Sequence, residues 1–363
     1  NNDPNYYFSP VVEGGNQVQD TVEAPYFNSS PIITLNYGDN DMTLLVGMYE
    51  LVTVGDQVWN DRDGNGILDN GESGMPNITA TLLNLNGTAI TSTTTDSNGT
   101  YFFTDLVPAG YAVHFSLPEG YVFTEHYHDN HDHTHSAVVN EETGTTNVTF
   151  LTSGEVETHY DAGMFEKVCI NGTTWHDLNA NGVQDEGEPV LESVMITLYR
   201  SDMGGRGQYQ TDTWTDANGY WAYDDLPPGY YIAEVAPPDH IIGGNPSFQL
   251  SPQVDPGLEG SNYDPTTWQT DETTLMGGEM ATFDAGLWLP AIIGDTVWYD
   301  SEPNGIEDGD EVPYDIPVTI VLYDALGNAV GETLSDENGI YSFTNVRPGN
   351  YSLEFILDDD HSF

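Results

Sequence analysis

Short runs of alternating hydrophobic and polar residues recur along the chain, and three of them occupy equivalent places in a repeated pattern. They span residues 77–83, 194–199 and 318–323. Alternation with a period of two predicts strands with one buried face. No segment of convincing length has the hydrophobic spacing of an amphipathic helix.

Turn signals separate these runs at regular intervals. A Thr/Ser-Asp-x-Asn-Gly turn follows each run, at residues 95–101, 215–221 and 335–341. Asn-Gly between alternating hydrophobic runs is the strongest short-range signal for a β-hairpin. A turn with proline and glycine comes next, at residues 107–111, 227–230 and 347–351. Short strands at this spacing predict an all-β chain of tandem Ig-like sandwich modules.

Longer repeats indicate the module boundaries. A strand that ends in tryptophan opens each module, at residues 54–59, 170–175 and 293–298. A Gly-hydrophobic-aromatic ending closes the first two modules, at 159–165 and 283–288, and also occurs at 43–49. The sequence therefore predicts a module tail over residues 1–51, a first module over 52–165, a second over 166–289 and an incomplete third over 290–363.

The tail and the incomplete module together have the length of one complete module. A sandwich without its last strand exposes an edge and part of its core, which proteins rarely leave unpaired. In one interpretation, residues 33–50 of one copy complete the 291–363 fold of another copy by strand addition. In the other, the chain is a window of a longer tandem array. Both interpretations predict a linear polymer of sandwiches in which copies of the chain are each other's partners.

The charge balance limits the other partners. The chain has 363 residues, of which 59 are acidic and 5 basic, for a net charge of −54. Nucleic acid is excluded as a partner because its phosphates require Lys and Arg, and anionic membrane surfaces are excluded for the same reason. No hydrophobic run approaches membrane-spanning length, so no membrane insertion is expected. Such a chain repels itself when compact unless cations lie among its carboxylates; adaptation to salty water is an alternative, and both can hold.

An acidic loop follows each opening strand, and each fits a twelve-residue EF-hand loop. That loop requires oxygen ligands at positions 1, 3, 5, 7, 9 and 12 and a glycine at position 6. The candidate calcium ligands, with position 7 contributing its backbone carbonyl, are Asp61, Asp63, Asn65, Ile67, Asp69, Glu72, Asp177, Asn179, Asn181, Val183, Asp185, Glu188, Asp300, Glu302, Asn304, Ile306, Asp308 and Glu311. One such loop alone could be a plain turn. Three at equivalent places favour Ca²⁺ in each module, and flanking strands in place of helices favour a strut over a sensor.

These motifs in combination resemble the SdrD B-like repeats of bacterial surface adhesins, within the Cna B-type sandwich group. The resemblance rests on the Gly-Asp-x-Val-Trp opening, the acidic loop, the Thr-Asp-x-Asn-Gly-x-Tyr turn and the Asp-Ala-Gly-Leu ending, and covers nearly the whole chain. It implies calcium-rigidified stalk domains outside the cell, and it implies further calcium ligands at Asp56 and Asp295, whereas the second module has Gly172 there. Many Cna B-type domains carry a Lys–Asn isopeptide bond. The single lysine, Lys167, lies outside the opening strand, so no such bond is expected.

Asn-x-Ser/Thr sequons are candidate glycosylation sites, although such sequons also arise by chance. They lie at Asn28, Asn77, Asn86, Asn98, Asn147, Asn171 and Asn350. In a secreted protein we expect some to carry glycans, foremost Asn86 and Asn98 in exposed turns. Asn171 lies in an opening strand, where burial is the alternative. The single cysteine, Cys169, is expected to be a small buried residue, with a cross-link between chains as the alternative.

One loop of the first module is rich in histidine. It contains His126, His128, His131, His133 and His135, interleaved with two aspartates. Imidazoles at this density suit a transition metal. A defined metal site usually needs a rigid scaffold, so a solvated loop that gains charge below about pH 6.5 is favoured, and a transition-metal site is the alternative.

The sequence contains no catalytic signature, and repetition argues against an enzyme because each module would need its own site. Two function classes remain. The chain is either an extracellular structural protein, a glycosylated subunit of a calcium-stabilised fibre or surface stalk, or a cell-surface adhesin or carbohydrate-binding module. The second class would use exposed aromatics such as Trp214, Trp221 and Trp268, whose alternative role is core packing. The complementary fragments at the two ends favour the fibre.

Overall fold

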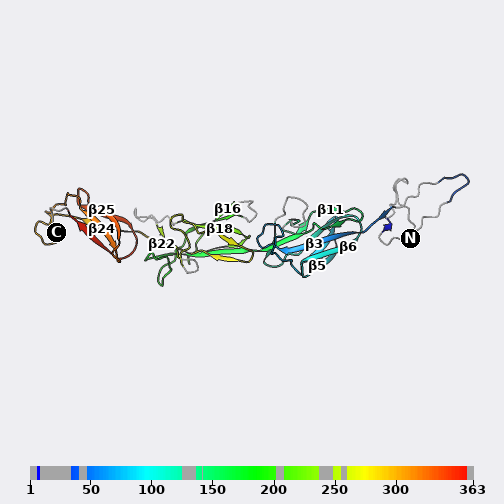
Figure 1. Ribbon diagram of the computed structural model, residues 1–363, viewed down its shortest axis with the longest axis horizontal. Helices are drawn as coiled ribbons and strands as arrows, with labels where there is room; N and C mark the ends of the chain where they lie inside the picture. The colour runs from blue at the N-terminus through cyan, green and yellow to red at the C-terminus, as the bar shows by residue number, and fades with distance from the viewer. Residues whose placement is uncertain are drawn as a thin grey trace.

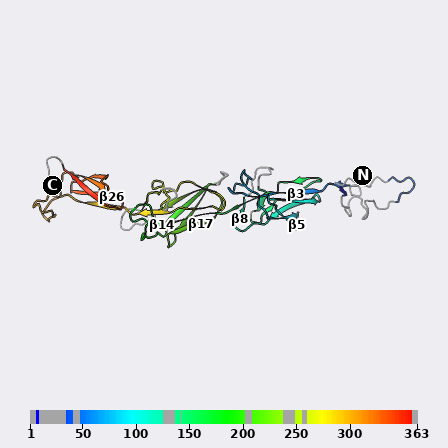
Figure 2. The same ribbon diagram turned by 60° about the horizontal axis from the view of Figure 1, so that its bottom comes forward.

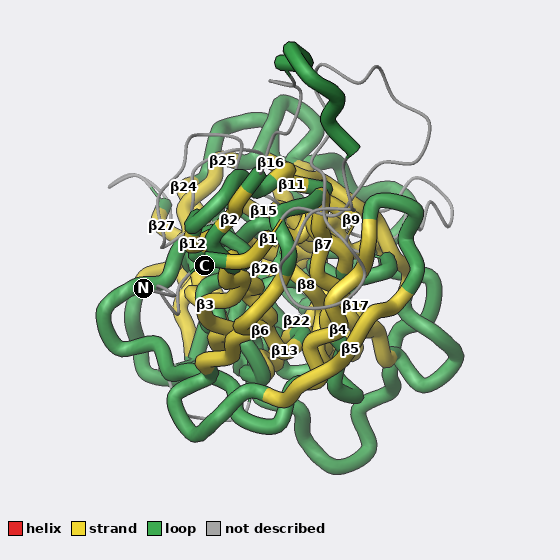
Figure 3. The backbone as a smooth tube through the Cα atoms, turned by 90° about the vertical axis from the view of Figure 1, so that its right-hand side faces the viewer, coloured by secondary structure: helices red, strands yellow, loops and turns green. Residues whose placement is uncertain are grey.

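The computed structural model describes residues 6–8, 34–40, 47–124, 136–140, 142–201, 208–236, 248–254 and 260–357. Every regular element among these residues is a β-strand. The strands form modules that follow one another along the long axis, with the two termini toward opposite ends (Figure 1; Figure 2). In the end-on view the strands of successive modules overlap, and loops surround them (Figure 3). The predicted all-β tandem fold is confirmed, and no helix in the described part is long and apolar enough to cross a membrane.

The first module contains two sheets around one core. Its strands are β3 (Val52–Asn60), β4 (Thr79–Asn84), β5 (Ala89–Thr94), β6 (Thr100–Leu106), β7 (Gly110–Phe115), β8 (Tyr121–Phe123), β9 (Val138–Asn140), β10 (Thr145–Thr146), β11 (Thr149–Phe150), β12 (Val156–Glu157) and β13 (Ala162–Glu166). One sheet has the order β5-β4-β7-β10-β9, with β11 against β7. The other has the order β12-β3-β13-β8, with β6 against β3.

The second module repeats this arrangement. Its strands are β14 (Val168–His176), β15 (Met195–Ser201), β16 (Gln208–Trp214), β17 (Tyr220–Leu226), β18 (Gly229–Ala236), β19 (Gln249–Leu250), β20 (Thr273–Leu275), β21 (Met280–Thr282) and β22 (Ala285–Trp288). One sheet has the order β17-β14-β22-β19, with β21 against β14, and the other has the order β16-β15-β18-β20.

The opening strand of each of these two modules is covered on both edges. β3 pairs antiparallel with β6 and parallel with β12 and β13, and β14 pairs in the same way with β17, β21 and β22. Trp59 and Trp175 at the ends of these strands are 0% and 1% exposed. Each module has its own cluster of buried hydrophobic residues, so the chain has separate cores in series.

The third module has an opening strand with one covered edge. Its strands are β23 (Ala291–Thr296), β24 (Thr319–Asp324), β25 (Ala329–Leu334), β26 (Ile340–Val346) and β27 (Tyr351–Ile356), paired as β23-β26 and β25-β24-β27. Within the described residues β23 has no parallel partner equivalent to β13 or β22. Its residues are exposed or half-buried, and Trp298 is half-buried where Trp59 and Trp175 are buried.

The N-terminal segment contains a small pair of strands. β1 (Tyr7–Phe8) pairs antiparallel with β2 (Met48–Tyr49), and the rings of Tyr7 and Tyr49 stack with centroids 6.0 Å apart. In this single chain β2 therefore pairs within its own segment. Part of the segment predicted to complete another copy, residue 33 and residues 41–46, lies outside the described residues, so strand addition stays a prediction.

Candidate metal centre

Each opening strand runs directly into an acidic loop: residues 61–72, 177–188 and 300–311 are the first, second and third acidic loops. In the first, Asp61 follows β3 and is 0% exposed. Its carboxylate accepts hydrogen bonds from the backbone N–H groups of Asn65 (3.2 Å) and Gly66 (2.9 Å). Gly66 has φ of 82°, a conformation that favours glycine. The loop is thus wrapped around a buried carboxylate.

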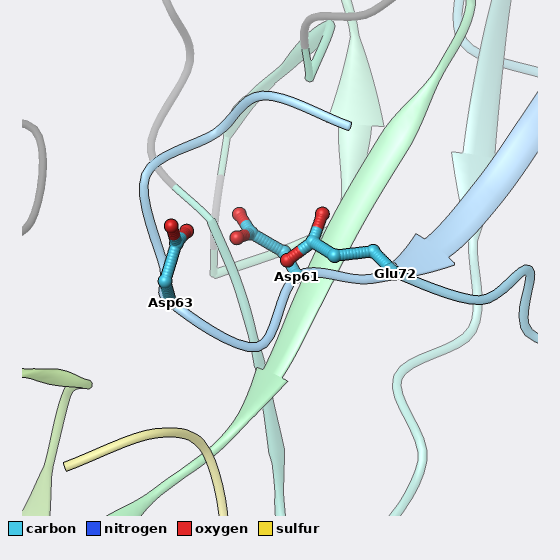
Figure 4. A group of neighbouring side chains, drawn as sticks. All are labelled: Asp61, Asp63 and Glu72. Carbon is cyan, nitrogen blue, oxygen red and sulfur yellow. The ribbon is translucent and has the colours of Figure 1, made fainter. Parts of the chain in front are cut away.

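Glu72 closes the first acidic loop from its other end. Its two carboxylate oxygens accept from the backbone N–H groups of Arg62 (2.7 Å) and Asp69 (3.0 Å). One ligand atom from each of Asp61, Asp63 and Glu72 lies within 4.8 Å of the others, and Figure 4 shows these carboxyl groups along the curve of the loop. Three carboxylates at this separation repel one another in the absence of a cation.

The electrostatic cost of this arrangement appears in the pKa values. The pKa of Asp61 is raised to about 7, first by burial and then by the charges of Glu72 and Asp63, against the lowering effects of the Thr124 hydroxyl and the Gly66 N–H. Burial also raises the pKa of Glu72, with the charges of Asp63 and Asp69 adding to the effect. A divalent cation among these oxygens would offset both effects and favour the ionised forms.

The second acidic loop makes the same backbone hydrogen bonds. Asp177 is also 0% exposed, and accepts from the N–H groups of Asn181 (3.1 Å) and Gly182 (2.7 Å). Glu188 accepts from the N–H groups of Leu178 (2.8 Å) and Asp185 (3.0 Å).

The third acidic loop repeats them once more. Asp300 accepts from the N–H groups of Asn304 (3.1 Å) and Gly305 (2.8 Å), and Glu311 from those of Ser301 (2.7 Å) and Asp308 (3.1 Å). Positions 1 and 12 are therefore held by equivalent backbone groups in all three loops.

Position 5 is an asparagine in every loop and links positions 7 and 9. Its amide nitrogen donates to the position 9 carboxylate, at 2.7 Å for Asn65, 2.9 Å for Asn181 and 2.9 Å for Asn304. Its amide oxygen accepts from the position 7 backbone N–H at 2.6 Å in each loop. The residues at positions 5, 7 and 9 are thus linked by hydrogen bonds in all three loops.

Position 3 varies between the loops. Asp63 accepts from the side chain of Asn65 (2.9 Å), and Asn179 donates to Asp185 (2.7 Å). Glu302 is exposed. The third acidic loop is the most open, since Asp300 is half-buried where Asp61 and its second-module equivalent are buried.

The first two acidic loops also contact the following module. The carbonyl oxygen of Arg62 accepts from the N–H of Gly277 at 2.7 Å. The carbonyl oxygen of Ala180 accepts from the guanidinium of Arg347. Backbone acceptors carry no side-chain signature, so sequence reasoning did not anticipate these joints.

A buried carboxylate in the module ending was also missed as a structural residue. Asp161 is 0% exposed, and accepts from the N–H of Gln57 at 3.1 Å, while its counterpart Asp284 accepts from Thr173 at 2.8 Å. The pKa of Asp161 is raised to about 9, first by burial and then by the charge of Asp56. This aspartate links the closing strand to the opening strand. Its recurrence in the Asp-Ala-Gly ending of both modules was the sequence signal that could have identified it.

The remaining candidate residues are placed as follows. The sequons at Asn77, Asn86, Asn98, Asn147 and Asn350 are exposed. Asn171 is half-buried, and its side chain accepts from Thr282 (3.1 Å) and donates to Met280 (3.4 Å). Asn28 and the histidine-rich loop, His126 to His135, lie outside the described residues.

The candidate thiol, lysine and tryptophans differ in their surroundings. Cys169 is half-buried, and burial raises its pKa. Lys167 forms an ion pair with Asp225 at 3.0 Å. Trp221 is buried in the second core, Trp268 packs against that core, and Trp214 is 59% exposed.

The sequence is similar to a known family along most of its length. The SdrD B-like domain matches residues 52–164, 169–287 and 291–363. The serine-aspartate repeat-containing protein F of Staphylococcus epidermidis is 33% identical over 89% of this chain and 19% of its own length. The serine-aspartate repeat-containing protein D of Staphylococcus aureus is 30% identical over 96% of this chain and 25% of its own length. The chain thus spans a quarter or less of these relatives.

Among solved structures, the minor pilin GBS52 of Streptococcus agalactiae has a TM-score of 0.23 and 12% identity, covering 66% of this chain and 95% of the pilin. A TM-score of 0.23 supports no inference about this chain.

Proposed function

Because the chain belongs to the SdrD B-like domain family, we propose that it is a structural element outside the cell, a non-enzymatic subunit of a calcium-stabilised fibre or surface stalk. The observation that carries the proposal is the threefold recurrence of one acidic loop with the same hydrogen bonds at positions 1, 5 and 12. The family indicates an extracellular or cell-surface location, and a net charge of −54 is consistent with it.

Calcium would bind the oxygens at positions 1, 3, 5, 7, 9 and 12 of each loop, and would supply positive charge there without any reaction. EF-hand loops offer oxygen ligands at these positions. The buried Asp61 and Asp177 would provide fixed ligands at the base of two loops. Since these two loops also contact the next module through Arg62 and Ala180, binding there would restrain the joint as well as the module.

Proteolysis with and without a chelator tests the calcium role. The full chain in excess calcium is expected to resist a broad-specificity protease, and chelation is expected to expose cleavage sites within and beside the acidic loops. Magnesium at the same concentration is the control, because Mg²⁺ demands a smaller octahedral shell. Identical cleavage patterns under all three conditions would contradict the calcium role.

Head-to-tail assembly is the finer part of the proposal. Met48 is 53% exposed, whereas Met164 and Leu287, at the same place in the other two module endings, are both 0% exposed. Among the described residues β23 of the third module pairs with β26 alone, so its other edge would accept a strand with this pattern. Residues 33–50 of one copy would supply it to the next, and a longer tandem array would supply the same strand from within one chain.

Met48→Asp tests this assembly directly. A charge at the buried position of a donated strand is expected to abolish association of the chain in calcium, measured by light scattering and electron microscopy. Ile90→Asp, at a 50% exposed position of β5, is the matched control and is expected to associate like the wild type. Association of Met48→Asp equal to that of the control would contradict strand addition.

An adhesin or carbohydrate-binding module is the second candidate, and the 59% exposed Trp214 favours it. Exposed tryptophan rings stack on sugars or pack in interfaces. Glycan-array binding that is lost in Trp214→Ala would support this candidate. Glycans on the chain itself, foremost at Asn86 and Asn98, are part of the fibre proposal and would be found by mass spectrometry of the native protein.

A further inference from the structure

The two joints between modules share one contact. In each, position 4 of an acidic loop lies against the proline turn of the next module. A Cβ at Gly64 would lie 3.3 Å from the Cδ of Pro228. At the second joint, Ala180 accepts its hydrogen bond from Arg347, which precedes the equivalent proline, Pro348.

The first joint has a second contact, made by position 2 of the loop. The carbonyl oxygen of Arg62 accepts from Gly277 at 2.7 Å, in the turn over residues 276–279. This turn also lies against Glu166, the last residue of β13, since a Cβ added at Gly278 would meet the carboxylate of Glu166. The acidic loop and the closing strand of one module thus contact the same turn of the next module.

Half of the same joint exists at the start of the first module. The turn over residues 152–155 is the counterpart of 276–279, because Thr152 and Met276 make the same N–H bond, to Glu155 (2.8 Å) and Glu279 (2.9 Å). A Cβ added at Gly154 would meet the carboxylate of Glu50, as one at Gly278 would meet that of Glu166.

Glu50 is also bonded to this turn. Its N–H donates to the Ser153 hydroxyl at 2.8 Å, and its carbonyl accepts from Gly154 at 3.3 Å. The chain therefore enters the first module in the way that β13 leads into the second, and no acidic loop contacts this turn among the described residues.

The other half of the joint is exposed at the far end of the chain. Residues 301–310 of the third acidic loop are all exposed. Ser301 holds position 2, equivalent to Arg62, and Pro303 holds position 4. Gly64 and Ala180 have φ of 68° and 57° at position 4, which a proline cannot adopt, so Pro303 can contribute ring packing but not the same backbone geometry.

We propose that the third acidic loop of one copy docks on the turns 107–110 and 152–155 of the next copy, so that the joint between subunits repeats the position 2 contact of the first internal joint and has ring packing at position 4. The carbonyl of Ser301 takes the place of the Arg62 carbonyl and accepts a hydrogen bond from the backbone N–H of Ser153, the counterpart of Gly277. Pro303 packs against Pro108. The occupant is a second copy of this chain, and the inference rests on the head-to-tail assembly proposed above.

Cross-linking between two single-cysteine proteins tests this docking. Ser301→Cys and Ser153→Cys are each prepared in full-length Cys169→Ser chains, mixed in calcium, and treated with a short bis-maleimide. A cross-linked dimer on a denaturing gel is expected, several-fold above the yield with Ser97→Cys in place of Ser153→Cys. Ser97 is exposed and lies in the hairpin turn at the opposite end of the first module.

An internal pair calibrates the chemistry, and microscopy separates the two proposals. Arg62→Cys with Gly277→Cys in one chain is expected to cross-link within the molecule. Filaments whose Ser301 and Ser153 cysteines cross-link no better than the Ser97 control would overturn the docking and leave head-to-tail assembly standing. If no association occurs by light scattering and no cross-link forms, both proposals fail.

Discussion

Glu72→Gln tests whether the carboxylates of the first acidic loop hold a cation. Glutamine keeps the shape of the side chain. However, its NH₂ group would face one of the two backbone N–H groups that donate hydrogen bonds to the Glu72 carboxylate. Loss of such a hydrogen bond to a charged group costs about 1.5–3 kcal/mol. The substitution also removes a charge that raises the pKa of Asp61, which offsets part of this cost when no calcium is present.

Calcium changes the balance. A ligand at a hundred times its dissociation constant stabilises the folded state by about 2.7 kcal/mol, which is about a hundredfold in the opening equilibrium. We expect the wild-type chain to lose protection of about that factor in β3 and β13 when calcium is chelated. The Glu72→Gln chain is expected to show little difference between the two conditions.

Hydrogen exchange of the full chain, read by mass spectrometry, measures this protection module by module. The second module, whose loop is unchanged, is the internal reference. Glu119→Gln, at an exposed position of the same module, removes one charge outside the loop and is expected to behave like the wild type. Calcium-dependent protection that survives in Glu72→Gln would refute the ligand role. An equal loss of protection with and without calcium would mean that only the hydrogen bonds matter.

Three further substitutions test the surrounding structure. The pKa of Asp161 is raised to about 9 from 3.8, so its contribution to stability is complete below the unfolded-state pKa and is lost as pH rises through 9. In chelator, Asp161→Asn is expected to flatten the fall in the melting temperature of the first module between about pH 5 and about pH 9. An unchanged slope would assign that fall to other groups. Arg347→Ala removes the donor to Ala180. It is expected to change module stability by less than about 0.5 kcal/mol but to broaden the distribution of angles between the second and third modules in electron micrographs. An unaltered distribution would count against this contact as a restraint. Gly163→Ala would place a Cβ 2.9 Å from Cζ2 of Trp59; overpacking of this kind costs about 1–3 kcal/mol, and a first module that melts at the wild-type temperature would show that the closing strand can shift.

Local elements were predictable because their determinants are close in sequence. In the first Thr-Asp-x-Asn-Gly turn, Asp96 accepts from the N–H groups of Asn98 (2.8 Å) and Thr100 (3.0 Å). Asp216 and Asp336 make the equivalent bonds in the other modules. A turn that is closed by its own aspartate needs no distant partner, so the motif alone indicates a hairpin.

The acidic loops were predictable for the same reason, since positions 1 and 12 are held by backbone groups inside the loop. The parts that sequence could not predict join residues far apart. Gln57 and Asp161 are 104 positions apart, and Ala180 and Arg347 are 167 apart. The second of these contacts uses a backbone carbonyl, which any residue has, so no residue pattern could indicate the joint.

The parallel pairing of β3 with β13 has a mechanical consequence. Tension along the array pulls the start of β3 backward and the end of β13 forward, and the two strands are neighbours that run in the same direction. The load therefore acts along the strands, so their hydrogen bonds share it and must break together, whereas a peeling load would break them one by one. β14 and β22 have the same arrangement, so each of these modules would resist stretching by shear at the strands through which force enters and leaves it.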